Sequence, residues 1–192
     1  MNVLYLHGFR SSPQSTKAQL MAAHFANTEH RFICPLLPAS PAVAMELARE
    51  LIEDRGDAAR DWALIGSSLG GYYATFLAEA YACRAALLNP AVMPADDLAG
   101  YVGELPSYHS GEPLVWRAEY LSELAMLQIA RITLPERYLL LAATGDEVLD
   151  WRQMRDHYPG AHQHIIEGSD HAITEFPDYV LQVAAFCISG RC

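Results

Sequence analysis

The chain has 192 residues, of which 52% are hydrophobic and 19% are charged, and its formal net charge is −10. This length supports one well-packed core, so we expect a single domain spanning residues 1–192. A chain this acidic, with no run of basic residues, should be repelled by nucleic acid and by anionic membrane surfaces. No apolar run approaches the roughly 20 residues that span a bilayer.

The first residues, MNVLYLHGF, lack the basic leader and the long apolar stretch of a signal peptide, which favours a cytoplasmic location. The cysteines lie far apart and form no CxxC pair, so we expect no zinc site and no disulfide framework. We accordingly expect neither a metal nor another cofactor. Composition predicts no particular oligomeric state.

Short apolar runs alternate with helical patterns along the chain, which is typical of βαβ units in a parallel sheet. The expected strands cover residues 2–6, 31–34, 62–65, 85–88, 138–143 and 164–167. The expected helices cover residues 15–26, 41–55, 69–81, 149–158 and 177–189. Ser40 can cap the second helix, and Pro41 suits its first position because no N–H is needed there. The pattern predicts an α/β fold with about six parallel strands flanked by helices.

Residues 91–134 break this alternation. The segment is rich in Pro, Gly and Tyr at first and then carries a helical pattern around residues 113–129. A connection this long inside a compact domain is usually a binding loop or a lid. We therefore expect a small helical cap over one end of the sheet.

Reactive side chains follow several of the predicted strands. They lie in the sequences His7-Gly8-Phe9, Gly66-Ser67-Ser68, Thr144-Gly145-Asp146 and Gly168-Ser169-Asp170-His171. Parallel strands joined by right-handed crossovers place their carboxyl ends along one edge, where such sheets bind ligands. We expect these side chains to meet at that edge.

The segment from Gly66 to Gly70 reads Gly-Ser-Ser-Leu-Gly and fits the G-x-S-x-G pattern between a predicted strand and a predicted helix. The pattern needs small residues on both sides of the serine because the chain turns sharply there. Ser68 is therefore the candidate nucleophile.

A serine hydroxyl needs a base to take its proton, and His171, which follows the last predicted strand, can supply it. Asp146 follows the fifth predicted strand and can orient the imidazole and stabilise its charged form. The order Ser68, Asp146, His171 is the order found in α/β-hydrolases. The backbone N–H groups of Leu69 and Phe9 are the expected oxyanion donors, since one follows the nucleophile and the other follows the first strand.

Five segments of the sequence carry a resemblance to a known family: YLHGFRSSPQSTKA, IGSSLGGYYATFLAE, LLNPAV, TGDEVLDWRQ and IIEGSDHAIT. Together they resemble the YqiA-type single-domain esterases of the α/β-hydrolase superfamily over essentially the whole chain. The resemblance implies the α/β-hydrolase fold, a triad of Ser68, Asp146 and His171, and hydrolysis of acyl esters or thioesters. One departure is Arg10, which follows HGF where the relatives carry asparagine.

Two positions have rival candidates. Ser67 competes with Ser68, but the glycine frame places Ser68 at the turn. Glu147 and Asp150 compete with Asp146 as the acid. Asp146 lies nearest the strand end, and Asp150 is better interpreted as the cap of the following helix.

Other titratable residues have structural interpretations. Asp170 precedes the candidate base, and since adjacent side chains usually diverge, we expect it to be solvated or to stabilise its loop. Two histidines, His162 and His164, alternate where a predicted strand begins, with no carboxylate or cysteine beside them, and His157 is nearby. They are better interpreted as surface histidines than as metal ligands. His7 is expected to brace the oxyanion loop or to touch the substrate.

Several aromatic residues and the predicted oxyanion loop are candidates for the substrate pocket. The tentative pocket residues are His7, Tyr72, Tyr101 and Tyr108. Ser15 and Lys17, next to Ser11 and Ser12, can either cap a helix or bind an anion at its start. The capping interpretation is favoured, although Lys17 is the single lysine of the chain.

The sequence as a whole predicts a serine esterase that hydrolyses small acyl esters or thioesters through an acyl-enzyme. Two alternatives remain: a lipase or acyltransferase that uses the same triad, and a binding module that kept the scaffold without catalysis.

Overall fold

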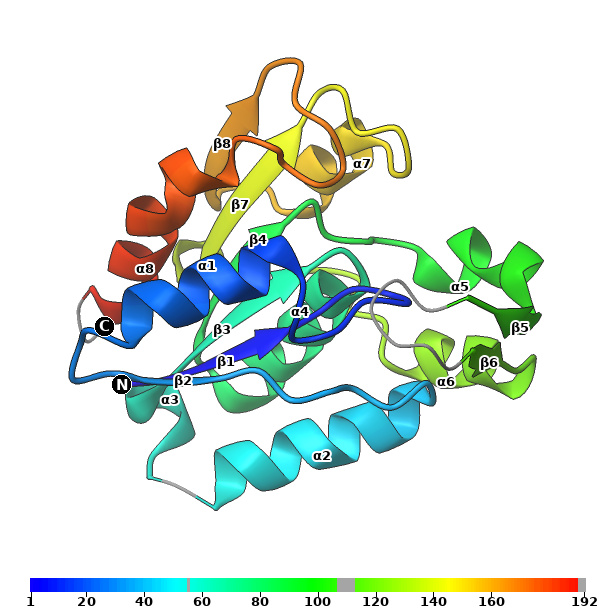
Figure 1. Cartoon of the computed structure of the whole chain (residues 1–192), viewed down its shortest axis with the longest axis horizontal. Helices are drawn as coiled ribbons and strands as arrows, with labels where there is room; N and C mark the ends of the chain where they lie inside the picture. Colours follow the sequence, from blue (N-terminus) through cyan, green and yellow to red (C-terminus); the bar gives the residue numbers. More distant parts are fainter. Residues whose placement is uncertain (55, 107–112, 190–192) are drawn as a thin grey trace.

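The computed structural model describes residues 1–54, 56–106 and 113–189 (Figure 1). Its centre is a six-stranded parallel sheet in the order β2-β1-β3-β4-β7-β8. The strands are β1 (Asn2–Leu6), β2 (Arg31–Ile33), β3 (Trp62–Ser67), β4 (Arg84–Leu88), β7 (Tyr138–Ala143) and β8 (His162–Ile166). Neighbouring strands pair in parallel throughout. The predicted α/β architecture is confirmed.

The central strands read as continuous apolar runs because both faces of the sheet are covered. Every residue of β3 and β7 is buried, whereas the edge strands β2 and β8 keep exposed positions. Near-continuous apolar strands are typical of parallel sheets with helices on both faces.

Helices cover the sheet on both sides (Figure 1). On one face, α1 (Thr16–Phe25) and α8 (Val180–Ile188) share a buried cluster with alternate residues of the central strands. On the other face, α2 (Pro41–Glu53), α4 (Leu69–Tyr81) and α7 (Trp151–His157) pack against the remaining strand residues. The short helix α3 (Ala58–Asp61) leads directly into β3.

Local sequence signals account for the helix boundaries. The Ser40 hydroxyl accepts a hydrogen bond from the N–H of Val43, and Pro41 opens α2. The Asp150 carboxylate accepts from the N–H of Arg152 at 2.9 Å, so this residue caps α7, as predicted. The last helix differs from expectation, because a 3₁₀ turn, η3 (Phe176–Tyr179), precedes α8. Another 3₁₀ turn, η2 (Pro135–Arg137), leads into β7.

The described parts of the segment 91–134 lie beyond the carboxyl ends of the strands, on the right in Figure 1. It contains α5 (Pro94–Asp97), η1 (Ala99–Tyr101), β5 (Gly103–Leu105), β6 (Leu114–Trp116) and α6 (Glu119–Met126). The helix expected over residues 113–129 was placed too early. Residues 114–116 pair antiparallel with residues 103–105 instead, and the helix starts only at Glu119.

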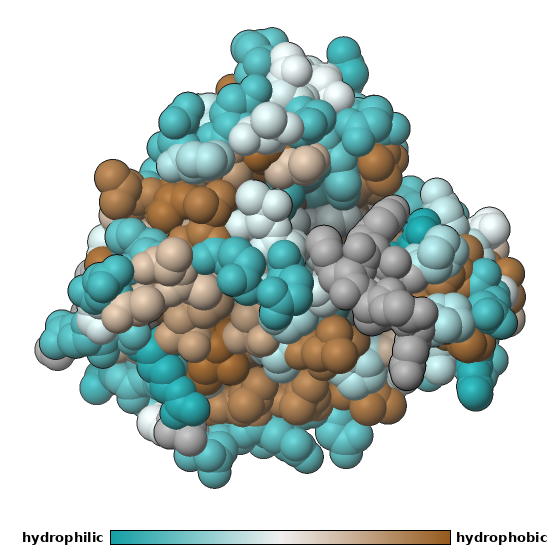
Figure 2. Space-filling model, in the orientation of Figure 1, coloured by the Kyte–Doolittle hydropathy of each residue, from teal (hydrophilic) through white to brown (hydrophobic). Residues whose placement is uncertain are grey.

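Several apolar side chains remain on the surface. Figure 2 shows hydrophobic residues gathered over α8 and near α2, and the exposed ones include Leu181, Ile188, Val43 and Leu36. Within the described residues, none of the helices combines the length and the apolar character that crossing a membrane requires.

Candidate active site

Ser68 occupies a strained turn between β3 and α4. Its backbone φ is 55° and its ψ is −122°, a conformation that a residue with a side chain rarely adopts. Its N–H donates to the carbonyl of Leu88 at 3.0 Å. A Cβ at Gly66 would lie 2.3 Å from the carbonyl oxygen of Gly70, and a Cβ at Gly70 would lie 1.9 Å from that of Leu6. The turn is therefore possible only with glycine at both positions.

The three residues predicted to act together are brought within hydrogen-bond distance of one another. His171 Nε2 lies 3.1 Å from Ser68 Oγ, and His171 Nδ1 lies 2.8 Å from Asp146 Oδ2. The Asp146 side chain is fully buried, whereas the His171 side chain is 22% exposed. The imidazole thus bridges a buried carboxylate and a hydroxyl that lines a cavity.

The carboxylate of Asp146 is fixed by its own turn. Its Oδ1 accepts hydrogen bonds from the N–H groups of Val148 and Leu149, at 2.8 and 2.9 Å. This leaves Oδ2 for the imidazole. The rival candidates Glu147 and Asp150 do not contact the imidazole in the described structure, since Asp150 caps α7 and Glu147 accepts from the backbone N–H of His171.

The backbone of His171 is held at both ends by side chains from other elements. Glu147 Oε2 accepts from its N–H at 3.0 Å. Its carbonyl oxygen accepts from the side-chain amide of Asn89 at 3.1 Å and from Lys17 Nζ at 3.4 Å. Sequence reasoning missed the role of Asn89, for which the only signal was an Asn-Pro pair that ends a strand.

The expected oxyanion donors lie beside Ser68. Leu69 is the first residue of α4, where a backbone N–H has no partner within the helix. Neither Leu69 nor Phe9 donates its N–H to another backbone carbonyl in the part of the chain that the structure describes. A Cβ built on Gly8 would lie 3.1 Å from Ser68 Cβ, so the loop with Phe9 passes directly over the serine.

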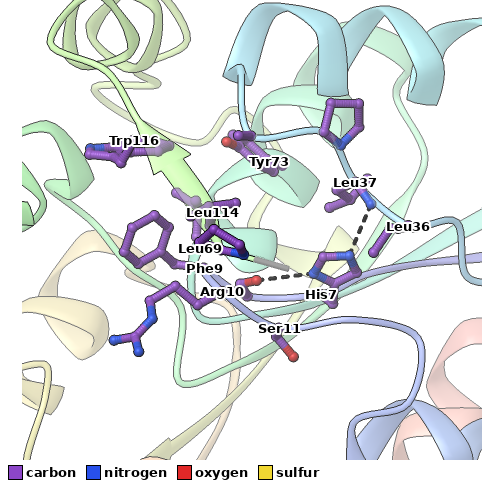
Figure 3. A pocket seen from close by; sticks show the side chains of 14 residues that line it. His7, Phe9, Arg10, Ser11, Leu36, Leu37, Leu69, Tyr73, Leu114 and Trp116 are labelled. Carbon is purple, nitrogen blue, oxygen red and sulfur yellow. Dashed lines mark hydrogen bonds between the residues drawn. The ribbon is translucent and has the colours of Figure 1, made fainter. Parts of the chain in front are cut away.

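Two cavities meet at this loop. The larger has a volume of about 450 Å³, and its lining includes Ser68, His171, Phe9 and Leu69. The smaller has a volume of about 180 Å³ and lies on the side of His7 and Tyr73, as Figure 3 shows. Gly8, Phe9, Arg10, Ser11 and Leu69 line both. The loop after β1 is therefore a wall shared by the two cavities.

His7 braces this wall, as one of its two predicted roles requires. Its Nε2 accepts from the N–H of Leu37 at 3.0 Å, and its Nδ1 lies 3.0 Å from the carbonyl oxygen of Gly8 (Figure 3). The ring is 95% buried and also lines the smaller cavity. Phe9 packs edge-on against Trp116 and Tyr101, which connects the loop to the segment 91–134.

The tentative pocket tyrosines have different positions. Tyr101 lines the larger cavity. Tyr72 lines neither of the two cavities; its hydroxyl donates to the carbonyl of Leu124 at 2.7 Å, and its neighbour Tyr73 lines the smaller cavity instead. Tyr108 lies outside the described residues.

Asp170, His162 and His164 make contacts within the protein. Asp170 accepts hydrogen bonds from the N–H and the hydroxyl of Thr174. His162 and His164 pack edge-on against Phe186 and Tyr179. Among the residues that the structure describes, no group of three or more histidines, cysteines or carboxylates is placed to hold a metal ion.

Comparison with known families and structures gives one family and a common fold. The model of an uncharacterised protein family, UPF0227, matches residues 2–188. The fold is similar to mouse α/β hydrolase domain-containing protein 10, with a TM-score of 0.70 and 18% identity, covering 96% of this chain and 87% of that chain. The esterase domain of a Rhodothermus marinus protein gives a TM-score of 0.69 and 16% identity, and the match covers 96% of this chain and 86% of that chain. Carboxylesterase CesB from Bacillus subtilis gives a TM-score of 0.60 and 16% identity, and the match covers 99% of this chain and 84% of that chain.

Proposed function

Since the chain belongs to the UPF0227 family and has the α/β-hydrolase fold of the YqiA-type esterases, we propose that it is a serine hydrolase of small acyl esters or thioesters. The observation that carries this proposal is the chain of hydrogen bonds from Asp146 through His171 to Ser68, at 2.8 and 3.1 Å. It ends at a hydroxyl that lines a cavity of about 450 Å³.

In the proposed reaction, Ser68 Oγ attacks the carbonyl carbon of the ester while His171 Nε2 takes the hydroxyl proton. The N–H groups of Phe9 and Leu69 stabilise the oxyanion that forms. When the bond to the leaving group breaks, His171 returns the proton to the departing alcohol or thiol. A water molecule, activated by the same imidazole, then hydrolyses the acyl-serine and releases the acid.

Asp146 supports both half-reactions without giving up a proton. Its buried carboxylate, already fixed by two backbone N–H groups, accepts from Nδ1 and so leaves Nε2 facing the serine. It also stabilises the imidazolium that forms during attack.

The volume of the larger cavity favours short or medium acyl groups. A volume of about 450 Å³ falls in the range that holds one small ligand. We therefore expect p-nitrophenyl butyrate to be hydrolysed faster than p-nitrophenyl palmitate. A preference for palmitate would support a lipase.

The test compares purified wild-type protein with Ser68→Ala on p-nitrophenyl acetate and butyrate and on an acyl-CoA thioester. The variant should lose at least about a thousandfold in kcat/KM. Ser189→Ala, at the end of α8 and distant from the cavity, is the matched control and should keep wild-type activity. Labelling of Ser68 by a fluorophosphonate probe adds a readout that needs no substrate. Folded wild-type protein that neither turns over these esters nor reacts with the probe would favour a non-catalytic binding module.

A further inference from the structure

One end of the larger cavity is lined by polar side chains that take no part in the proposed ester hydrolysis. Tyr5, Ser15, Lys17 and Ser67 line the cavity together with Ser68 and His171. We call these four residues the polar niche. They come from β1, from the start of α1 and from the end of β3, so the niche lies on the face of the sheet that α1 covers.

The hydroxyl of Tyr5 is buried at the base of the niche, beside the hydroxyls of Ser67 and Ser15. The side chain is fully buried, and within the described structure the hydroxyl has no hydrogen-bond partner. Burial raises the pKa of Tyr5 and the nearby Cys34 raises it further, whereas the hydroxyls of Ser67 and Ser15 lower it by less, so the phenol keeps its proton. A buried donor without a partner costs free energy unless a ligand or water accepts from it.

The start of α1 adds further donors. Ser15 is the N-cap residue, but its hydroxyl accepts no capping hydrogen bond, and the first turn carries no acidic residue. The first intrahelical bond runs from the N–H of Gln19 to the carbonyl of Ser15. The earlier N–H groups of this ten-residue helix therefore have no carbonyl partner inside it, and with the helix dipole they favour a negative charge.

Lys17 brings a positive charge to the same place. Its Nζ donates to the carbonyl oxygens of Ala172 and His171 at 2.6 and 3.4 Å. It forms no salt bridge with any residue that the structure describes, although Asp146 and Asp170 lie near enough to attract its charge. The third ammonium hydrogen is thus available to a ligand.

The opposite end of the cavity has the opposite character. Asp97 and Tyr101, from α5 and η1, line it together with Leu98. Burial and the nearby Asp96 raise the pKa of Asp97, and an ionised carboxylate at this end of the cavity would repel an anionic group. An anionic group would therefore be directed toward the niche.

We propose that the polar niche binds an anionic oxygen group, a carboxylate or a phosphate, carried by the substrate. The inference rests on the proposed hydrolase function and narrows the substrate class to acyl esters or thioesters with such a group. The anion would accept from the Tyr5 hydroxyl, from Lys17 Nζ and from the first N–H groups of α1.

The test measures inhibition of p-nitrophenyl butyrate hydrolysis by glutarate and by inorganic phosphate, each against chloride at equal ionic strength. Either anion should compete with the ester more strongly than chloride does. Comparing inhibition by glutarate with inhibition by phosphate shows whether the niche prefers a carboxylate or a phosphate. Lys17→Met should weaken this inhibition about tenfold and Tyr5→Phe about fivefold, because each removes a hydrogen bond to a charged group. The proposal is overturned if neither anion competes better than chloride, or if both variants are inhibited as wild type is.

Tyr158→Phe is the matched control, since it also removes a buried hydroxyl but on the opposite face of the sheet, where that hydroxyl contacts Thr75. Its inhibition should equal that of wild type. A second measurement needs no hydrolysis: glutarate or phosphate should raise the Tm of Ser68→Ala protein, and Lys17→Met in that background should abolish the rise. Loss of activity with a persistent Tm shift would reject the hydrolase alone, whereas activity without anion effects would reject the niche alone.

Discussion

The side-chain amide of Asn89 donates to the carbonyl oxygen of His171 at 3.1 Å. The same nitrogen donates to the carbonyl of Asp170 at 3.0 Å, and the amide oxygen accepts from the N–H of Ala143 at 2.8 Å. Asn89 is fully buried and has a φ of 44°. One side chain therefore connects the loop that carries His171 to the end of β7, the strand that Asp146 follows.

The first prediction concerns this connection. Asn89→Ala should lower kcat on p-nitrophenyl butyrate by about a hundredfold with little change in KM, because a misplaced His171 weakens proton transfer more than ester binding. The lost bonds should also lower the free energy of unfolding by about 2 kcal/mol. Asn27→Ala, which removes an exposed amide at the end of α1, is the control. A change in KM alone would contradict a positioning role.

The second prediction follows from the backbone of Ser68. A residue with φ 55° and ψ −122° is strained unless it is glycine, and such strain costs about 1–3 kcal/mol. Ser68→Gly should therefore be inactive but should have a higher Tm than Ser68→Ala, measured by calorimetry. If Ser68→Gly melts below Ser68→Ala, the turn is not a source of strain.

The third prediction concerns acid stability. Glu79 of α4 accepts from Thr133, Tyr138 and Arg137, and its side chain is only 10% exposed. Burial alone would raise the pKa of Glu79, but the hydrogen bonds from Thr133 and Tyr138 and the charge of Arg137 outweigh it and lower this pKa below the ordinary 4.5.

At pH values between the pKa of Glu79 in the folded protein and its pKa in the unfolded chain, the unfolded chain binds more protons at this residue. The free energy of unfolding therefore rises with pH over this range. The contribution of Glu79 is complete above the unfolded pKa and is lost as pH falls through the folded pKa. Glu79→Gln should lower the free energy of unfolding at pH 7 by about 3 kcal/mol, measured by urea titration. In this variant the free energy of unfolding should also fall less steeply as the pH is lowered below 5. Glu136→Gln, at an exposed carboxylate, should leave both unchanged.

The fourth prediction concerns the pH dependence of anion binding. Burial lowers the pKa of Lys17 to about 8, although Asp170 and Asp146 oppose this, so the ammonium loses its charge as pH rises through that value. Inhibition by glutarate should therefore weaken between pH 7 and pH 9. Asp146 and Asp170 act on the charge of Lys17, and its ammonium donates to the carbonyl of His171. The other charged or titratable residues that line the same cavity are Tyr5, Arg10, Asp97 and Tyr101.

Carboxylates and guanidinium groups do not titrate between pH 7 and pH 9. Lys17→Met separates the effect of the lysine from that of His171, since the variant should show weak inhibition with no further decline over this range. A decline of equal size in the variant would assign it to another group.

The sheet and the meeting of Ser68, Asp146 and His171 at one edge of it were predictable because their signals are local. Runs such as Tyr138–Ala143 are apolar on both faces, and glycines two residues either side of Ser68 report one sharp turn. The hairpin in the segment 91–134 was not predictable, because Leu114–Trp116 becomes a strand only by pairing with Gly103–Leu105.

The roles of Asn89 and Lys17 were beyond sequence reasoning for a similar reason. Their partners lie 82 and 154 residues away along the chain, and the contacts exist only once the ends of β4, β7 and β8 and the start of α1 have come together. Tyr72 was assigned to the pocket in place of Tyr73 because adjacent residues of a helix point in directions that differ by about 100°. A motif identifies the turn, but the direction of each later side chain depends on how the helix packs.

The arrangement of the first and last elements has a practical consequence. The start of β1 and the end of α8 lie on the side of the molecule opposite the segment 91–134 (Figure 1). A fusion partner or a surface tether attached at either of these ends would point away from the carboxyl ends of the strands. The protein can therefore be immobilised for binding and turnover measurements with the edge of the sheet that carries Ser68 and His171 facing away from the support.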